Sequence, residues 1–354
     1  MGRFSSFVAT RWKLLLNVGT IVALIITLYV IRHDLVTTFR DLLRVNAWAL
    51  VLMVPLEALN YHAQTRLYQH LFRRVGNEIK YKHLLLASLE LNFVNHVFPS
   101  GGAAGISYFG IRLKNDEITG AKATVVQFMK LVLTFLSFEI LIILSLFFLA
   151  IGGKVNDLTI LVSAILSTLL IVLSVLFIYI IGDKKRINSF LGYIAKQVNS
   201  LMQLIRPSEK DVINKDRARI VFDDLHETYI KMRQDRKELR APLMYALLAN
   251  LTEVAVIYVV FLAFGKFVNP GAVILAYGIA NFAGFVSVMP GGVGIYETLM
   301  VAVLLTTGIS PDLSLPVIIM YRVLNTLLQL PPGYYLYQKY ISQHGKPPKM
   351  EEVI

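Results

Sequence analysis

The stretch that decides the fold is NFAGFVSVMPGGVGIYE, from Asn281 to Glu297, in which a proline and two glycines interrupt an apolar run. A second interruption of this kind, FPSGG, lies at 98–102. Proline removes a backbone donor and disfavours helix in the residue before it, while glycine allows a tight reversal. A helix broken at membrane depth is tolerated where the freed backbone is buried in protein or lines a cavity, commonly a transport or binding site. The two breaks therefore predict a site as well as a fold.

The composition indicates an all-α polytopic membrane protein. The 354 residues are 56% hydrophobic, their mean hydropathy is +0.60, and several apolar runs reach the roughly twenty residues that a membrane-spanning helix needs. The net charge is +12, but Lys and Arg lie mostly between the apolar runs, as in cytoplasmic loops, which argues against nucleic-acid binding. The chain has no cysteine, which excludes disulfides, thiol nucleophiles and thiolate metal sites.

The apolar runs predict about six full spans and two re-entrant, broken helical hairpins. The run 84–111 lies between basic loops that belong to one membrane face, yet it is shorter than the roughly forty residues of two spans. It is therefore predicted to be a hairpin that turns at 99–102, and the run 272–307 to be its counterpart. For the second break, a simple kink in an ordinary helix pair is the alternative. The six spans are expected at 14–31, 47–61 (reaching 67 if tilted), 123–151, 158–181, 241–264 and 315–337.

Loop charge predicts that both termini are cytoplasmic, and the protein is expected in the plasma membrane. The two hairpins then enter from opposite faces of the membrane, as expected for two repeats of inverted topology. Within the large insert, 187–205 has the spacing of an amphipathic helix on the membrane surface, and the remainder is predicted to be a charged linker. The expected organisation is a first membrane half at 1–182, a cytoplasmic insert at 183–240, a second membrane half at 241–340 and a cytoplasmic tail at 341–354.

Polar side chains inside the apolar runs predict where the site lies, because such residues are costly in a membrane and commonly functional. Lys130 and Arg322 are the cations with the strongest claim, and either could bind a lipid phosphate. The alternative is that they neutralise Glu297, Glu253 or Glu90 internally. Glu57 and Glu139, each alone on an apolar span, are expected to be structural. The predicted headgroup-binding residues are Glu90, Asn92, Asn95, His96, Pro99, Gly101, Gly102, Lys130, Glu253, Asn281, Pro290, Gly291, Gly292, Gly294, Glu297 and Arg322.

The glycine-rich breaks have a chemistry of their own. Each is followed by apolar residues that could begin a half-helix, and backbone amides at such a helix start can bind phosphate. The sequence contains no motif of a soluble catalytic site and no convincing metal cluster among its seven histidines. We therefore expect neither a cofactor nor a metal.

The residues from Pro290 to Glu297 resemble the PGG-x-G-x-x-E motif of the lysylphosphatidylglycerol synthase transmembrane region, a flippase-like family. The stretch from Leu91 to Gly102 is similar to the first motif of that family, and Arg322 within YRVL matches a later arginine. The resemblance covers about 14–340. This chain differs in lacking the Gly-Asp that often follows the first motif, and in having Lys130 where the family often has arginine.

The resemblance implies a lipid flippase-like protein. The best-known members, the multiple peptide resistance factors, join such a region to an aminoacyl-transferase domain, and the insert at 183–240 is too small to be one. We therefore expect no synthase activity and no enzyme. The expected function is to translocate or bind an anionic phospholipid or an isoprenoid-linked lipid. The alternative is an accessory membrane subunit of a lipid-modifying or cell-envelope enzyme, and the expected protein partner is such an enzyme or a second copy of the chain.

Overall fold

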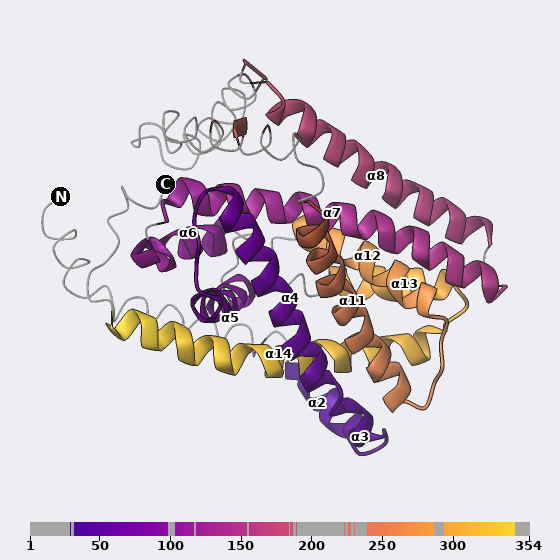
Figure 1. Cartoon of the computed structure of the whole chain (residues 1–354). Helices are drawn as coiled ribbons and strands as arrows, with labels where there is room; N and C mark the ends of the chain where they lie inside the picture. Colours follow the sequence, from indigo (N-terminus) through magenta and orange to yellow (C-terminus); the bar gives the residue numbers. More distant parts are fainter. Residues whose placement is uncertain are drawn as a thin grey trace, which may run out of the picture.

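The computed structural model of the chain is helical throughout the part that it describes, with no strand there (Figure 1). The described residues are 29, 32–97, 103–116, 118–153, 156–183, 185–186, 189, 223, 226–227, 230, 239–286 and 294–343. The helices in these residues are α2 (Arg32–Leu42), α3 (Ala47–Leu50), α4 (Met53–Arg74), α5 (Tyr81–Val97), α6 (Ala103–Arg112), the 3₁₀ turn η1 (Lys114–Asp116), α7 (Gly120–Ile151), α8 (Asp157–Ile181), α11 (Arg240–Ala263), α12 (Pro270–Val286), α13 (Ile295–Thr306) and α14 (Pro311–Gln343).

Four helices in the described residues are long and apolar enough to cross a membrane, namely α7, α8, α11 and α14. The bent pair that includes α2, α3 and α4 raises the number to five if it forms one span. The six predicted spans are thus not all found in this part of the chain, because the first, at 14–31, lies outside it except for Tyr29. The expected second span also differs, because α3 ends at Leu50 and α4 continues to Arg74.

Each proline-glycine break lies between two short helices, α5 and α6 in the first case and α12 and α13 in the second. The breaks themselves, with Phe98 to Gly102 and Ser287 to Val293, lie outside the described residues. Gly294 ends the second break in a left-handed conformation, with φ of +88°, which glycine adopts without strain. Its N–H donates to Glu297 Oε2 at 2.7 Å, which caps the start of α13.

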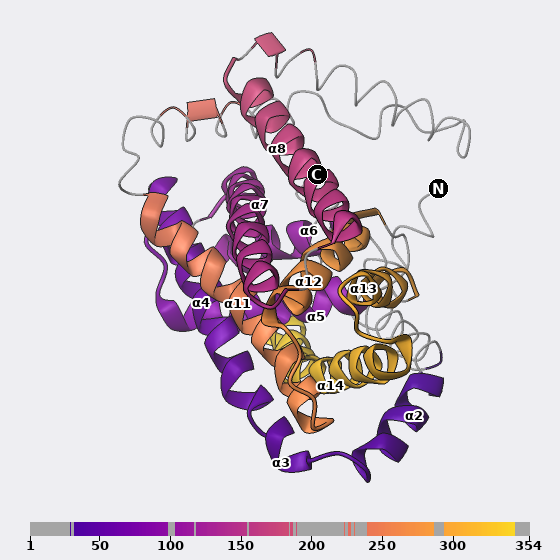
Figure 2. The same cartoon turned by 90° about the vertical axis from the view of Figure 1, so that its right-hand side faces the viewer.

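The order of elements is the same in the two halves of the described bundle. A long helix, two short helices around a break and a second long helix occur as α4 to α7 and again as α11 to α14. The contacts between the halves correspond as well. The first long helices, α4 and α11, pack on each other. The first short helix of each half packs on the last long helix of the other half, α5 on α14 and α12 on α7. Figure 2 shows α4 and α11 side by side, with α13 next to α14.

A glycine allows the close contact between α5 and α14. A Cβ at Gly333 of α14 would lie 2.6 Å from Phe93 Cβ and 2.8 Å from the Leu89 carbonyl oxygen of α5. Only a residue without a Cβ fits this approach, so Gly333 sets the distance between α5 and α14.

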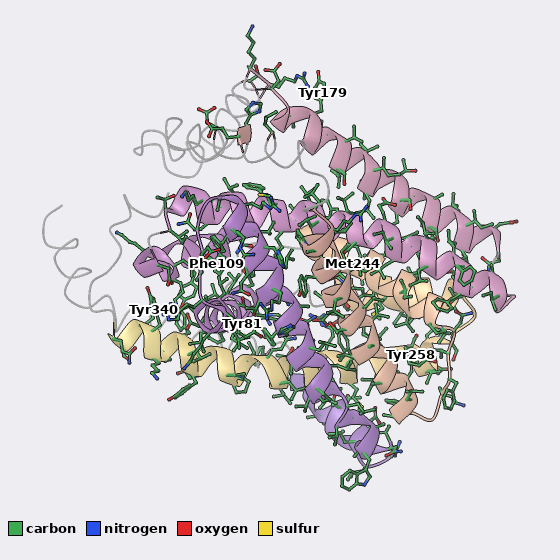
Figure 3. The ribbon with its side chains drawn as sticks, viewed as in Figure 1. Tyr81, Phe109, Tyr179, Met244, Tyr258 and Tyr340 are labelled. Carbon is green, nitrogen blue, oxygen red and sulfur yellow. The ribbon has the colours of Figure 1, made fainter. Side chains whose placement is uncertain are left out.

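The helix α8 lies at the outside of the bundle and packs mainly on α7. Apolar side chains along it are exposed, among them Ile160, Ile165 and Val172. Figure 3 shows Tyr179 at the outer end of α8, away from the other helices. An apolar outer face is what a helix in contact with lipid presents.

Candidate functional site

Polar side chains form a stripe on one face of α4. Glu57, Asn60, Tyr61, Gln64 and Tyr68 recur at intervals of three and four residues, so they project from the same side of the helix. The stripe covers about 16 Å of helix at 1.5 Å per residue. It contacts α11 because Asn60 donates to the Ala249 carbonyl oxygen at 2.8 Å and to the Thr252 hydroxyl at 3.0 Å. It contacts α5, α7 and α14 through the hydrogen bonds described below. We call these residues and their partners the polar seam.

The middle of the polar seam joins both halves of the chain. Gln329 of α14 donates to Glu57 Oε2 at 3.0 Å, and its own amide oxygen accepts from Asn92 of α5 at 2.6 Å. Asn92 also donates to the hydroxyl of Tyr61 at 2.7 Å. Glu57 is 5% exposed. A predicted residue, Asn92, and one expected to be merely structural, Glu57, thus belong to one hydrogen-bonded network.

Lys130 of α7 lies at one end of the polar seam and is half-buried. Its ammonium group donates to Gln64 Oε1 at 3.0 Å and to the Tyr68 hydroxyl at 3.1 Å, and it lies 4.7 Å from the centre of the Tyr68 ring. Gln64 in turn donates to Asn60 Oδ1 at 2.6 Å. These partners are all neutral. Within the described residues no carboxylate pairs with Lys130, so its charge is available for an anion.

Arg322 lies on the same side of α14 as Gln329, two turns earlier. It forms an ion pair with Glu297 of α13, and its guanidinium lies 5.0 Å from the centre of the Tyr296 ring. Glu297 also caps the N-terminus of α13 through Gly294. The internal neutralisation that was one of the two expectations for Arg322 is therefore present, and it fixes α14 against the helix that follows the second break.

The predicted carboxylate Glu253 of α11 has a different environment. Its Oε2 accepts from the Tyr321 hydroxyl at 3.0 Å. Glu57 is on the facing helix, where Asn60, one turn later, donates to the hydroxyl of Thr252 beside Glu253. Within the described residues neither carboxylate forms an ion pair. Asn281 donates to the carbonyl oxygen of Tyr277, one turn back in its own helix, so this contact does not join it to the polar seam.

Glu90 is paired with a residue that the sequence placed in a loop. Arg112, the last residue of α6, donates to Glu90 Oε2 at 2.6 Å, and the Tyr108 hydroxyl donates to the same oxygen at 2.7 Å. Glu90 is 2% exposed. Of the three carboxylates that were alternative partners for Lys130 and Arg322, Glu90 is paired with Arg112 instead, because α6 packs on α5 and brings Arg112 to it.

The remaining predicted residues lie around the first break or outside the described part. His96 Nδ1 is 2.9 Å from the carbonyl oxygen of Asn92, one turn earlier, and Asn95 is exposed with its side chain against Gly105 of α6. Pro99, Gly101, Gly102, Pro290, Gly291 and Gly292 lie outside the described residues, as does most of the insert.

Sequence reasoning missed most of the α4 side of the polar seam. Asn60, Tyr61, Gln64 and Tyr68 are ordinary polar residues near the end of an apolar run, and each alone carries little information. Their spacing from Glu57 is the signal that could have found them, because it puts these polar residues on one face of the helix.

The comparisons with known proteins point to a membrane protein family. The UPF0104 membrane protein PH1989 of Pyrococcus horikoshii is 23% identical over 238 residues, which are 66% of this chain and 69% of that protein. No solved structure matches the chain. The model of the lysylphosphatidylglycerol synthase TM region matches residues 14–333. The chain therefore belongs to the family of the lysylphosphatidylglycerol synthase TM region.

Proposed function

We propose that the protein binds a phosphate-bearing lipid, an anionic phospholipid or an isoprenoid-linked lipid, and moves its headgroup between leaflets along the polar seam. The observation that carries the proposal is Lys130, a half-buried cation in a candidate span whose described partners, Gln64 and Tyr68, are neutral. Removing an ammonium group from water costs solvation free energy, and a charge-assisted hydrogen bond to a phosphate oxygen would compensate that cost. A purely structural lysine would more commonly be paired with a carboxylate.

The rest of the polar seam supports the same function. Between Lys130 and Glu57, the face of α4 carries amide and hydroxyl side chains. Glu57 then accepts from Gln329 of α14, the helix that also carries Arg322. A headgroup needs such a polar path, while its acyl chains can stay among the apolar outer faces of the helices. The names of the family and of its relative describe only a membrane region and a membrane protein.

We also propose how the chain lies in the membrane. The two short-helix pairs, α5 with α6 and α12 with α13, would form re-entrant hairpins that enter from opposite faces of the plasma membrane, and both termini would be cytoplasmic. The matching order of elements in the two halves supports an internal repeat. The lengths of the short helices, 17 and 10 residues and 17 and 12 residues, support hairpins because a full span needs about twenty.

Leaflet exchange of fluorescent lipids in proteoliposomes tests the function. We expect wild-type protein to accelerate exchange of an anionic phospholipid or an isoprenoid phosphate, and Lys130→Gln to reduce it by about tenfold to a hundredfold. A hydrogen bond to a charged group contributes about 1.5–3 kcal/mol, and each 1.4 kcal/mol is about a factor of ten.

The matched control is Lys122→Gln, the same change eight residues earlier on α7, where the ammonium bonds Asn77 Oδ1 instead of the polar seam. It should exchange lipid at the wild-type rate. Equal loss in both variants would remove the special role of Lys130. No acceleration of any phosphate-bearing lipid by wild-type protein would contradict the proposed function.

A further inference from the structure

Two carboxylates lie on facing helices of the bundle, and neither forms an ion pair within the part of the chain that the structure describes. Glu57 belongs to α4 and Glu253 to α11, the helix that packs along α4. Asn60, one turn after Glu57, donates to the hydroxyl of Thr252, the neighbour of Glu253, at 3.0 Å, which places the two carboxylates on facing sides of these helices. Each accepts one hydrogen bond from a neutral group, Glu57 from Gln329 at 3.0 Å and Glu253 from Tyr321 at 3.0 Å. Among the described residues no lysine, arginine or histidine forms an ion pair with either. Two negative charges so placed would repel each other in a medium that solvates them poorly.

The side chain of Asn325 lies on the same helix as the two donors. It is one turn after Tyr321 and one turn before Gln329 on α14, so it lies on the same face of the helix as these two residues. Asn325 Oδ1 is buried and has no hydrogen-bond partner in the described residues, and the same is true of Glu57 Oε1. Both atoms are acceptors. Each of these two buried oxygens therefore lacks a hydrogen-bond donor or a positively charged group.

The other titratable groups around the pair do not supply that charge. Four tyrosines interact with it electrostatically, one each from α4, α12, α13 and α14, and all are hydroxyl donors at neutral pH. They are Tyr61, Tyr277, Tyr296 and Tyr321. The cation Arg322 lies beyond the ring of Tyr296 and is paired with Glu297. From α5, the neutral residue Asn92 donates to Gln329, which in turn donates to Glu57.

We propose that Glu57 and Glu253 together bind one proton, and that uptake and release of this proton accompany lipid movement along the polar seam. A proton on Glu57 Oε1 supplies the missing donor, removes the repulsion and leaves one negative charge on the pair. No other reactant is needed, because the proton comes from water on one face and leaves to water on the other. The coupling rests on the proposed function, whereas the proton site itself does not.

The proton site is tested on purified full-length protein by infrared difference spectroscopy, without any lipid transport. At neutral pH we expect a signal from the C=O stretch of a protonated carboxyl group, and Glu57→Gln and Glu253→Gln each to remove it. Both substitutions keep the shape of the side chain, and size-exclusion chromatography checks that the variants are folded. Glu139→Gln is the matched control, because Glu139 is a carboxyl of α7 that interacts with Ser167 and not with the pair.

The coupling is tested by leaflet exchange in proteoliposomes across an imposed pH gradient. A gradient of one unit corresponds to about a tenfold bias if one proton moves with each lipid. Wild-type protein and Glu139→Gln should show a bias of this order, while Glu57→Gln and Glu253→Gln should lose it. Both arms are repeated with and without Na⁺ at constant pH, because a sodium ion could supply the same positive charge.

The outcomes separate the two proposals. A carboxyl signal that is lost in both variants, with exchange that responds to the pH gradient, supports the inference in full. If the signal is lost in both variants but no lipid exchanges, the proton site is supported, while the proposed function and the coupling are overturned. Absence of the signal, its survival in both variants, or its removal by Na⁺ overturns the proton site. Exchange that ignores the pH gradient overturns the coupling.

Discussion

At the scale of single residues, the described cations near the candidate site differ in whether a carboxylate neutralises them. Arg112 is paired with Glu90 and Arg322 with Glu297, and each pair joins the helices on the two sides of a break or of a turn. Lys130 has neutral partners. Because a paired charge is neutralised within the protein, we assign the headgroup to Lys130 first and to Arg322 second.

The Arg322–Glu297 pair gives a prediction about stability. Arg322→Gln and Glu297→Gln each leave the partner charge poorly solvated, so each should destabilise the fold by about 3–5 kcal/mol. The double variant should be more stable than the sum of the two losses, because no unpaired charge is left. Thermal unfolding in detergent, followed by size-exclusion chromatography, measures the three variants. Losses that simply add would show that the two side chains do not act as a pair.

At the scale of the elements, the sequence predicted the bounds of some helices and not of others. The apolar runs around Leu166 and Val256 predicted α8 and α11 within a few residues, because a helix buried in lipid needs an unbroken apolar stretch. By contrast, α14 runs through Pro316, Pro331 and Pro332 and is longer than predicted. Proline is tolerated there because neighbouring groups satisfy the freed backbone, which depends on packing that sequence alone does not show.

The close approach of α5 and α14 gives a prediction at this scale. Gly333→Ala should destabilise the protein by about 1–3 kcal/mol, because the new methyl group would overlap Phe93 and the backbone of Leu89. Gly120→Ala is the matched control, since a Cβ at that helical position meets nothing within 4 Å, and alanine favours helix. Thermal unfolding of both variants tests the contact. Equal stability of Gly333→Ala and wild type would mean that the two helices are further apart.

At the scale of the whole molecule, the candidate site is assembled from residues far apart in the chain. Glu57 meets Gln329, and Lys130 meets Gln64, so the polar seam needs both halves of the bundle. The sequence predicted the single members Lys130, Arg322 and Asn92 from their polarity in apolar runs. It could not predict which of them touch, and Glu57 was expected to be structural, because helix packing decides those contacts.

The absence of cysteine from the chain makes the membrane arrangement directly testable. Single cysteines at Lys80 and Lys114 flank the first short-helix pair, and single cysteines at Lys266 and Ser310 flank the second. If both pairs are re-entrant, membrane-impermeant thiol reagents should label the first two from one face and the last two from the opposite face. Labelling of Lys80 and Lys114 variants from opposite faces would show instead that the first pair crosses the membrane.

The central claim is that a lipid headgroup enters the polar seam, and photo-crosslinking with labelled lipids tests it most directly. One probe carries a photoreactive group on the phosphate-linked headgroup and another carries it at the end of an acyl chain. We predict that the headgroup probe modifies peptides with Gln64 and Lys130, and that the acyl probe modifies the outer face of α8, around Ile165. Headgroup labelling confined to the loops and helix ends, with the peptides of the polar seam unmodified, would contradict the account.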